Sequence, residues 1–174
     1  MKNLWAPWRM EYILGQDRPQ GCIFCPEKGR SFDRERLMLH IGADSLVMMN
    51  RYPYNNGHLL VAPVRHLEDP RQLTEKESAD LWSLVNASLT CLEKVMKPDG
   101  FNVGLNLGPE AGAGVAAHLH VHIVPRWAGD VNFMTVLDEV RSIPEHILST
   151  FDRLRPAWAE AFHLDPAPEA LRRS

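Results

Sequence analysis

The sequence predicts an α+β fold: an antiparallel sheet of about five strands with a long helix and a C-terminal helix. Short apolar runs bounded by Gly, Pro and Asn are typical of strands. One central segment repeats its apolar residues at three- and four-residue steps, which indicates a helix. The order along the 174 residues is strands, helix, strands, helix, and this length favours one domain with extensions.

The first two predicted strands are 45–49 and 58–62, with Pro63 ending the second. They are joined by the sequence NRYPYNNG, whose Asn and Gly residues favour a turn. The long helix is predicted to start at Thr74, which has capping-box spacing to Glu77, and to end at the sequence KPDG.

The next strand is predicted over 101–105, where Phe, Val and Leu alternate with polar residues and Gly, a pattern typical of a half-buried strand. The last predicted strand, 118–126, alternates strictly and is expected to end at Pro125. Residues 147–162 are predicted to form the C-terminal helix, interrupted near Pro156.

Four regions are expected along the chain. Residues 1–30 form an N-terminal arm, with a Cys-x-x-Cys motif, that packs on the body. Residues 31–140 form the main domain, 141–164 a helical extension, and 165–174 a frayed tail.

Composition excludes several classes of protein. The net charge of −3 argues against a broad nucleic-acid-binding surface. The sequence shows no signal peptide and no apolar run long enough to cross a membrane, so we expect no membrane partner. Three cysteines are too few, and odd in number, for a disulfide framework, which favours the reducing cytoplasm.

The predicted last strand carries the most informative pattern. His118, His120 and His122 alternate with apolar residues, so the three imidazoles should share one face of the strand. A half-exposed strand would use Thr, Lys or Ser more readily than three histidines, which repel one another when protonated. Two functional interpretations remain: a metal site, or nucleophilic and acid–base catalysis.

The preceding loop favours catalysis on a phosphate. Gly108, Gly112 and Gly114 allow backbone N–H groups to turn inward and form an anion-binding nest. Glu110 is the only acidic residue near the strand in sequence, whereas a catalytic metal centre would more often include carboxylate ligands.

At this point the sequence resembles a known family. The segment HLHVHIVPR from His118 resembles the signature of the histidine triad (HIT) superfamily, and NRYPYNNGHLLVAP from Asn50 is similar to its second motif. The arm LWAPWR from Leu4 and the segment WAGDVNF from Trp127 further resemble the bacterial branch that includes diadenosine tetraphosphate phosphorylases.

The resemblance implies an enzyme that acts at the α-phosphate of a purine nucleotide, a diadenosine polyphosphate, through a nucleotidyl-histidine intermediate with phosphate or water as acceptor. His120 would be the nucleophile, and His122 and His58 would donate to the phosphate oxygens. The substrate-binding residues implied by the motifs are Asn50, Asn106, Gly112, Gly114, Val115, His122 and Arg126. Leu46, Met48 and Ile23 are candidates for the base pocket, although each also fits a plain apolar core.

The resemblance also implies a structural zinc ion and a homodimer. Cys22, Cys25, His66 and His118 occupy the positions of a Cys₂His₂ site in zinc-binding relatives; no organic cofactor is implied. A reduced, unliganded cysteine pair and a redox Cys-x-x-Cys are the alternatives for the two cysteines. The relatives pair through the long helix and the adjoining strand.

Two other functions remain open: a nucleoside phosphoramidate hydrolase on the same fold, and a non-catalytic nucleotide or metal sensor. Arg126 has a second interpretation, as an ion pair that fixes the strand end. His40, His146 and His163 are expected to face solvent.

Overall fold

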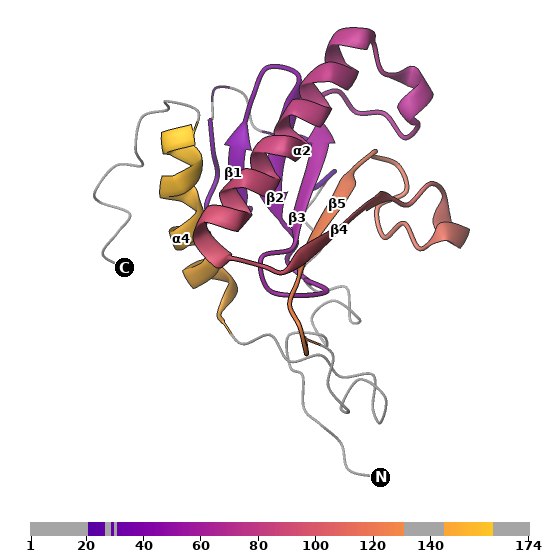
Figure 1. The fold of residues 1–174 in the computed structure, drawn as a ribbon. Helices are drawn as coiled ribbons and strands as arrows, with labels where there is room; N and C mark the ends of the chain where they lie inside the picture. The colour runs from indigo at the N-terminus through magenta and orange to yellow at the C-terminus, as the bar shows by residue number, and fades with distance from the viewer. Residues whose placement is uncertain (1–20, 27–28, 30, 131–144, 162–174) are drawn as a thin grey trace.

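The computed structural model describes residues 21–26, 29, 31–130 and 145–161 and confirms the α+β prediction. The strands are β1 (Met38–Ile41), β2 (Ser45–Met49), β3 (Leu59–Pro63), β4 (Gly100–Leu105) and β5 (Val121–Arg126). The helices are α2 (Glu75–Met96) and α4 (Ile147–Ala161), with the short 3₁₀ helices η1 (Pro70–Gln72) and η2 (Pro109–Ala111). The strands form one antiparallel sheet in the order β1-β2-β3-β5-β4 (Figure 1).

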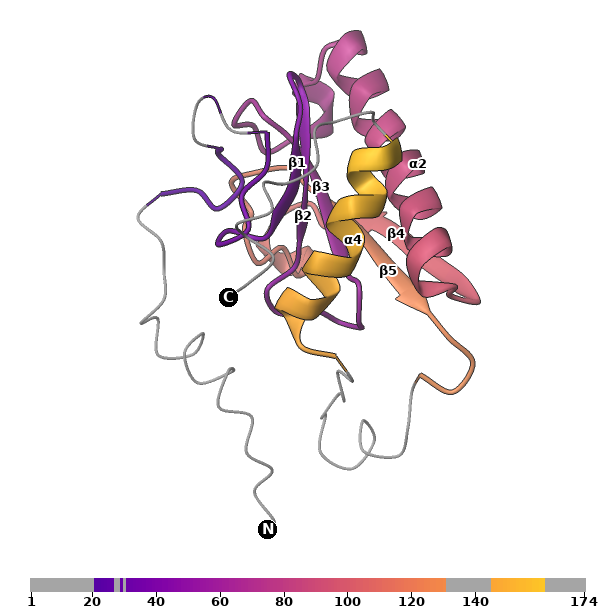
Figure 2. The ribbon, with the colours of Figure 1, turned by 90° about the vertical axis from the view of Figure 1, so that its left-hand side faces the viewer.

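Both long helices lie on the same face of this sheet (Figure 2). On that face Val47, Val61 and Ile123 pack with residues of α2 and α4 in the larger apolar core. The alternate residues of β2 and β3, such as Met48 and Leu60, belong to a second apolar cluster that has no helix in it. Because side chains alternate along a strand, the two clusters lie on opposite faces. The helix-free face is therefore the one open to a functional site.

Helix α2 begins and ends where local sequence signals place it. Thr74 is its N-cap, and its side chain and that of Glu77 form the reciprocal capping box. Lys97 ends the helix in the left-handed conformation, with φ of 51°. The predicted long helix is confirmed.

The predicted last strand, 118–126, starts too early, because β5 begins at Val121. Residues 118–120 lie outside β5, and the N–H of Leu119 donates to the carbonyl of Leu67 instead of joining the ladder. Pro125 does not end the strand, which continues to Arg126 beside β4. The pairing of β5 with β3 already ends at Ile123. On the same side of β5, the carbonyl of Pro125 accepts a hydrogen bond from the side chain of Asn55. Because no strand pairs with that side of Pro125, its missing N–H costs the sheet no hydrogen bond.

The structure also corrects the predictions for α4, for β4 and, in the next paragraph, for His40. Helix α4 runs through Pro156 without interruption, because Phe151, Leu154 and Trp158 are buried on both sides of the proline. The apolar alternates of β4 are buried only at its start: Phe101 packs against the larger apolar core, whereas Val103 and Leu105 are 42% and 37% exposed at the sheet edge.

His40 was expected to face solvent but is buried, 9% exposed, with its ring centroid 6.0 Å from that of Trp158. It lies in β1, a strand for which no range was predicted, because its four residues are almost all buried and show no alternation. A bulge between Met38 and His40 turns the imidazole inward. His146 is exposed as expected.

Some predictions fall on residues that the structure does not describe. These are the arm before residue 21, the segment 131–140 of the main domain, His163 and the tail 165–174. The four-region division of the chain stays a prediction. None of the described helices has the length and apolar character needed to cross a membrane.

Candidate functional site

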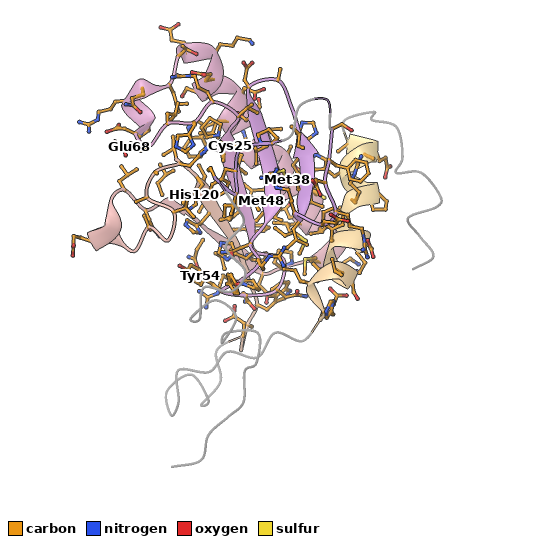
Figure 3. The ribbon with its side chains drawn as sticks, turned by 180° about the vertical axis from the view of Figure 1, so that it is seen from behind. Cys25, Met38, Met48, Tyr54, Glu68 and His120 are labelled. Atoms are coloured by element: carbon orange, nitrogen blue, oxygen red, sulfur yellow. The ribbon has the colours of Figure 1, made fainter. Side chains whose placement is uncertain are left out.

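The three alternating histidines gather on the helix-free face of the sheet. Figure 3 shows this face, with His120 between Cys25 and Tyr54 and with Met48 to one side. His118 and His120 lie in the extended segment just before β5, and His122 lies within it. The ring centroids of His120 and His122 are 4.9 Å apart, and those of His58 and His122 are 5.2 Å apart. His58 is the residue before β3. His58, His120 and His122 are called the histidine row below.

The proton on His120 is placed by a backbone carbonyl. Its Nδ1 lies 2.8 Å from the carbonyl oxygen of His118, and a carbonyl oxygen only accepts. Nδ1 therefore carries the hydrogen, and Nε2 keeps its lone pair. Burial is the main cause that lowers the pKa of His120 below its ordinary value, which favours the neutral, nucleophilic ring.

A second chain of hydrogen bonds sets the protons on His58 and His122. The backbone N–H of Tyr54 donates to Nδ1 of His58 at 3.1 Å, so the hydrogen of His58 is on Nε2. That Nε2–H donates to Nδ1 of His122 at 3.0 Å, so neutral His58 has no N–H left for the phosphate contact that the resemblance implied. The hydrogen of His122 is therefore on its own Nε2, a buried atom with no partner among the described residues.

Both rings of this chain are held neutral. Burial, reinforced by neighbouring imidazoles, lowers the pKa of His58 to about 3. The same causes lower the pKa of His122 to about 4. Near neutral pH the row thus offers one lone pair, on Nε2 of His120, beside one unsatisfied N–H donor, on Nε2 of His122. A nucleophile next to a donor is the arrangement that attack on a phosphoryl group requires.

Asn50 contacts His58 rather than standing clear of the loop. Its Nδ2 is 3.3 Å from Nδ1 of His58, and its Oδ1 accepts from the N–H of Tyr52 at 2.9 Å. Both ends of the amide are thus engaged in ordering the turn between β2 and β3. The expected contact with ribose stays a prediction.

The glycine-rich loop lies exposed between β4 and the histidine row. Gly108 and Gly112 have φ of 82° and 83°, values that a residue with a Cβ rarely adopts. Asn106 donates from Nδ2 to the carbonyl of Gly112 at 3.4 Å. Gly114 has no positive φ, and Val115 packs at the edge of the second apolar cluster. Within the loop the N–H groups of Ala111 and Ala113 donate to the carbonyl of Gly108, and the expected anion-binding nest stays a prediction.

The three base-pocket candidates meet in the second apolar cluster. Leu46 and Met48 are 0% and 5% exposed, and Ile23 packs against them from the segment before β1. Phe24 also belongs to this cluster, and its ring stacks on His120 at 4.8 Å between centroids. Phe24 was missed from sequence, although its place between two cysteines was a usable signal.

Tyr54 is a second residue that sequence reasoning missed. Its ring is 46% exposed and lies 4.9 Å from the ring of His58 and 5.9 Å from that of His122, nearly parallel to the latter. Together with its N–H bond to His58, this places both its backbone and its ring at the end of the histidine row.

Arg126 is held at the strand end. Its Nε and Nη2 donate to the two carboxylate oxygens of Asp130 at 2.6 and 2.9 Å, and its Nη1 donates to Asn102 at 2.9 Å. The structure thus places Arg126 in the ion pair that was its alternative interpretation. A contact between Arg126 and substrate stays a prediction.

The four expected metal ligands form a compact cluster. One ligand atom from each of Cys22, Cys25, His66 and His118 lies within 4.8 Å of the others. Nδ1 of His118 is 3.2 Å from Sγ of Cys22 and 3.2 Å from Nδ1 of His66, and Sγ of Cys25 is 3.4 Å from the latter. Tetrahedral zinc, with bonds near 2.0 Å to nitrogen and 2.3 Å to sulfur, separates neighbouring ligands by about 3.3–3.8 Å. The donor set fits that ion, and the three separations above lie close to this range; the widest separations in the cluster, up to 4.8 Å, would have to shorten around it.

The tautomer of His118 fits as well. Its Nε2 lies 2.8 Å from the carbonyl oxygen of Pro63, so the ring hydrogen is on Nε2 and the lone pair is on Nδ1. That lone pair faces the two sulfurs and the ring nitrogen of His66. Nitrogen lone pairs that face two thiols are suited to bind a soft divalent metal.

Comparison with known proteins gives a consistent picture. The HIT domain family matches residues 39–129. An AP-4-A phosphorylase of Mycobacterium tuberculosis is 37% identical over 166 residues, which cover 91% of this chain and 85% of the relative. An asymmetrical bis(5'-nucleosyl)-tetraphosphatase of Schizosaccharomyces pombe is 37% identical over 86 residues, which cover 49% of this chain and 47% of the relative.

Solved structures share the fold. A hypothetical histidine triad nucleotide-binding protein from Sulfolobus tokodaii is 27% identical with a TM-score of 0.58, over 73% of this chain and 83% of that one. A zinc-bound histidine triad family protein from Mycobacterium smegmatis has a TM-score of 0.60 at 22% identity, over 89% and 95% of the two chains.

Proposed function

This chain belongs to the HIT-domain family, and on that premise we propose that it is an enzyme acting at the α-phosphate of a purine nucleotide, with a diadenosine polyphosphate as its substrate. The relatives named as a phosphorylase and as a tetraphosphatase support this substrate class. The observation that carries the proposal is the opposite proton placement on neighbouring rings: Nδ1–H on His120 and Nε2–H on His122.

The proposed reaction has two steps. Nε2 of His120 attacks the α-phosphorus, the bond from phosphorus to the bridging oxygen breaks, and the remaining polyphosphate leaves with the bridging electrons. The N–H of His122 donates to a non-bridging oxygen, where negative charge grows in the transition state. Inorganic phosphate or water then attacks the nucleotidyl-histidine, and His120 leaves with its lone pair restored.

Other residues bind the substrate in this proposal. Asn106 and the backbone N–H groups of Gly112, Gly114 and Val115 contact the phosphates, and Asn50 contacts the ribose. Leu46, Met48 and Ile23 form the wall against which the base rests. The chain has Ala113 where a hydroxyl or amide side chain would add a contact to the leaving group, so backbone N–H groups supply the contacts there.

The test is turnover of diadenosine tetraphosphate with and without inorganic phosphate, with products separated by chromatography. Formation of ADP and ATP that depends on phosphate identifies a phosphorylase, and formation of AMP and ATP without phosphate identifies a hydrolase. Absence of turnover in both buffers would contradict the diadenosine substrate, and adenosine phosphoramidate would be the next substrate tried. A protein that binds nucleotide yet turns over neither would be a sensor.

We further propose that Cys22, Cys25, His66 and His118 hold a structural zinc ion. The ligand spacing and the tautomer of His118 support it. Zinc bound there would neutralise the two thiolates and join the segment before β1 to the residues preceding β5. The small, odd number of cysteines supports the expected location in a reducing cytoplasm.

We also propose a homodimer formed through α2 and β4. β4 is an edge strand whose Val103 and Leu105 are 42% and 37% exposed, and Trp82 of α2 is 50% exposed. Exposed apolar side chains on a strand edge favour pairing with a second chain. Light scattering on the wild type and on Val103→Lys, with circular dichroism as a check of folding, tests it: a monomeric wild type contradicts the proposal.

A further inference from the structure

Arg36 stands outside both centres but contacts the segment that links them. It lies in a tight turn in which Asp33 and Met38 exchange backbone hydrogen bonds at 2.9 and 2.7 Å. The side chain of Asp33 accepts from the N–H of Arg36 at 3.1 Å. Leu37, next in the chain, is buried with φ of 60°, a conformation that an L-residue adopts only when its surroundings enforce it. The turn therefore fixes where the side chain of Arg36 begins.

The guanidinium of Arg36 meets three backbone carbonyls at once. Its Nη2 lies 2.9 Å from the carbonyl oxygen of Cys25, 3.0 Å from that of Ile23 and 3.4 Å from that of Cys22. These three carbonyls belong to the turn that the N–H of Cys25 closes onto the carbonyl of Cys22. A single cation thus holds the carbonyls of this turn together.

Few other hydrogen bonds hold this turn. Among the described residues, the bonds from Arg36 are the ones that tie the backbone of 22–25 to the rest of the chain. The sulfurs of Cys22 and Cys25 instead contact His118 and His66, the other two proposed ligands. Arg36 therefore holds the backbone of the turn by hydrogen bonds, while the cysteine side chains of the same turn face the other proposed metal ligands.

We propose that Arg36 is the positioning residue of residues 22–25, called the cysteine turn below. It holds both sulfurs at ligand spacing before a metal ion binds. The inference rests on the zinc site proposed above. A flexible turn would have to be ordered when zinc binds, which lowers affinity. By ordering the turn in advance, Arg36 raises the affinity of the protein for zinc.

The same contacts hold Phe24 against the nucleophile. Phe24 lies within the cysteine turn and is 0% exposed. Its ring stacks on that of His120 with an interplanar angle of 26°. Arg36 thus orders one wall of the catalytic centre and half of the metal centre together. All three contacts come from the single nitrogen Nη2, at the far end of the arginine side chain. Lysine should replace arginine only in part, because its shorter side chain ends before that position.

The test compares zinc affinity of the full-length wild type with that of Arg36→Ala, Arg36→Lys and Arg34→Ala. Arg34 is the matched control, because it belongs to the same turn but pairs with Asp152 of α4 at 2.9 Å and has no hydrogen bond to the cysteine turn. Zinc dissociation constants are measured by competition with a chromophoric chelator, and melting temperatures are recorded with and without zinc.

We expect Arg36→Ala to raise the zinc dissociation constant about 10- to 100-fold, the range typical of residues that support metal ligands. Arg36→Lys should lie between it and the wild type, and Arg34→Ala should stay within about twofold of wild type. Excess zinc should restore the melting temperature of Arg36→Ala more than that of Arg34→Ala.

Equal zinc affinities in wild type and Arg36→Ala would overturn the inference and leave the zinc site standing, as would equal weakening by Arg36→Ala and Arg34→Ala. A wild type that binds no zinc would overturn both. If Arg36→Ala does not fold, Arg36→Lys decides: wild-type affinity in that variant contradicts a role for the guanidinium.

Discussion

His118 and His120 are two residues apart, yet they present opposite ring nitrogens. His118 commits Nε2 to the carbonyl of Pro63 and turns the lone pair of Nδ1 toward two sulfurs. His120 commits Nδ1 to the carbonyl of His118 and leaves the lone pair of Nε2 free. The same residue type, in one short segment, thus presents Nδ1 to the proposed metal ligands at one position and leaves Nε2 free, as the proposed nucleophile, at the other. The difference comes from which nitrogen a backbone carbonyl engages.

The largest expected effect is the loss of kcat on replacing the proposed nucleophile His120, with the proposed zinc site left intact. His120→Ala should lower kcat on the proposed substrate, diadenosine tetraphosphate, by about 10⁴-fold or more. The reason is that no other side chain of the histidine row offers a lone pair at that place. Zinc content, measured by elemental analysis, should stay at the wild-type level because the four ligands remain. Loss of zinc in this variant would show that the two centres cannot be separated.

His122→Ala removes the donor without removing the lone pair. We expect kcat to fall about 100- to 1000-fold, as for loss of one transition-state donor. His146→Ala, an exposed site outside the row, is the control and should leave kcat unchanged. A kcat for His122→Ala within a few-fold of wild type would contradict the proposed role of its N–H.

Cys22→Ser tests the comparison from the metal side. Zinc affinity should fall by about 100-fold or more, because a hydroxyl is a poor zinc ligand and does not ionise as a thiol does. Residual kcat, measured in excess zinc, should stay within about tenfold of wild type because His120 keeps its carbonyl partner. A collapse of kcat comparable to that of His120→Ala would show that zinc does more than hold the segment.

The smallest effect concerns pH. His58 has a pKa of about 3 in the folded protein, against an ordinary value of 6.5. Between these values the unfolded chain binds a proton that the folded chain does not, so acid favours unfolding. Stability should therefore fall as pH drops below about 6.5, by about 1 kcal/mol per pH unit from this ring.

Urea denaturation between pH 6.5 and 5, at fixed zinc concentration, measures this slope in the wild type, His58→Asn and the control His146→Asn. The slope should become shallower in His58→Asn alone. An unchanged slope in His58→Asn would mean that another group carries the acid sensitivity.

Local signals made part of the fold predictable from sequence. The capping box of Thr74 and the helical repeat set the start and course of α2. β1 carries no such signal, because a short strand buried on both faces does not alternate, and the bulge that buries His40 depends on packing against α4. The end of β5 depended on where its neighbour β3 stopped pairing, which the proline itself does not reveal.

For the candidate site, alternation placed the three imidazoles on one face, although two of them precede the strand. The meeting of Cys22 with His118, 96 residues apart, was implied only by family resemblance, since spacing along the chain says nothing of a contact made in three dimensions. Phe24, Tyr54 and Arg36 were missed because their roles come from neighbours distant in sequence. The proton positions were also out of reach, because they depend on single carbonyl and amide contacts.

The donor that starts the proton arrangement of His58 and His122 is the main-chain N–H of Tyr54. Every amino acid except proline supplies that group. Drift in the side chain at position 54 would therefore leave this donor in place, and Tyr54→Pro is the one substitution that removes it. The side-chain amide of Asn50 lies 3.3 Å from the same nitrogen, so an evolving population would carry a second donor that does depend on a side chain.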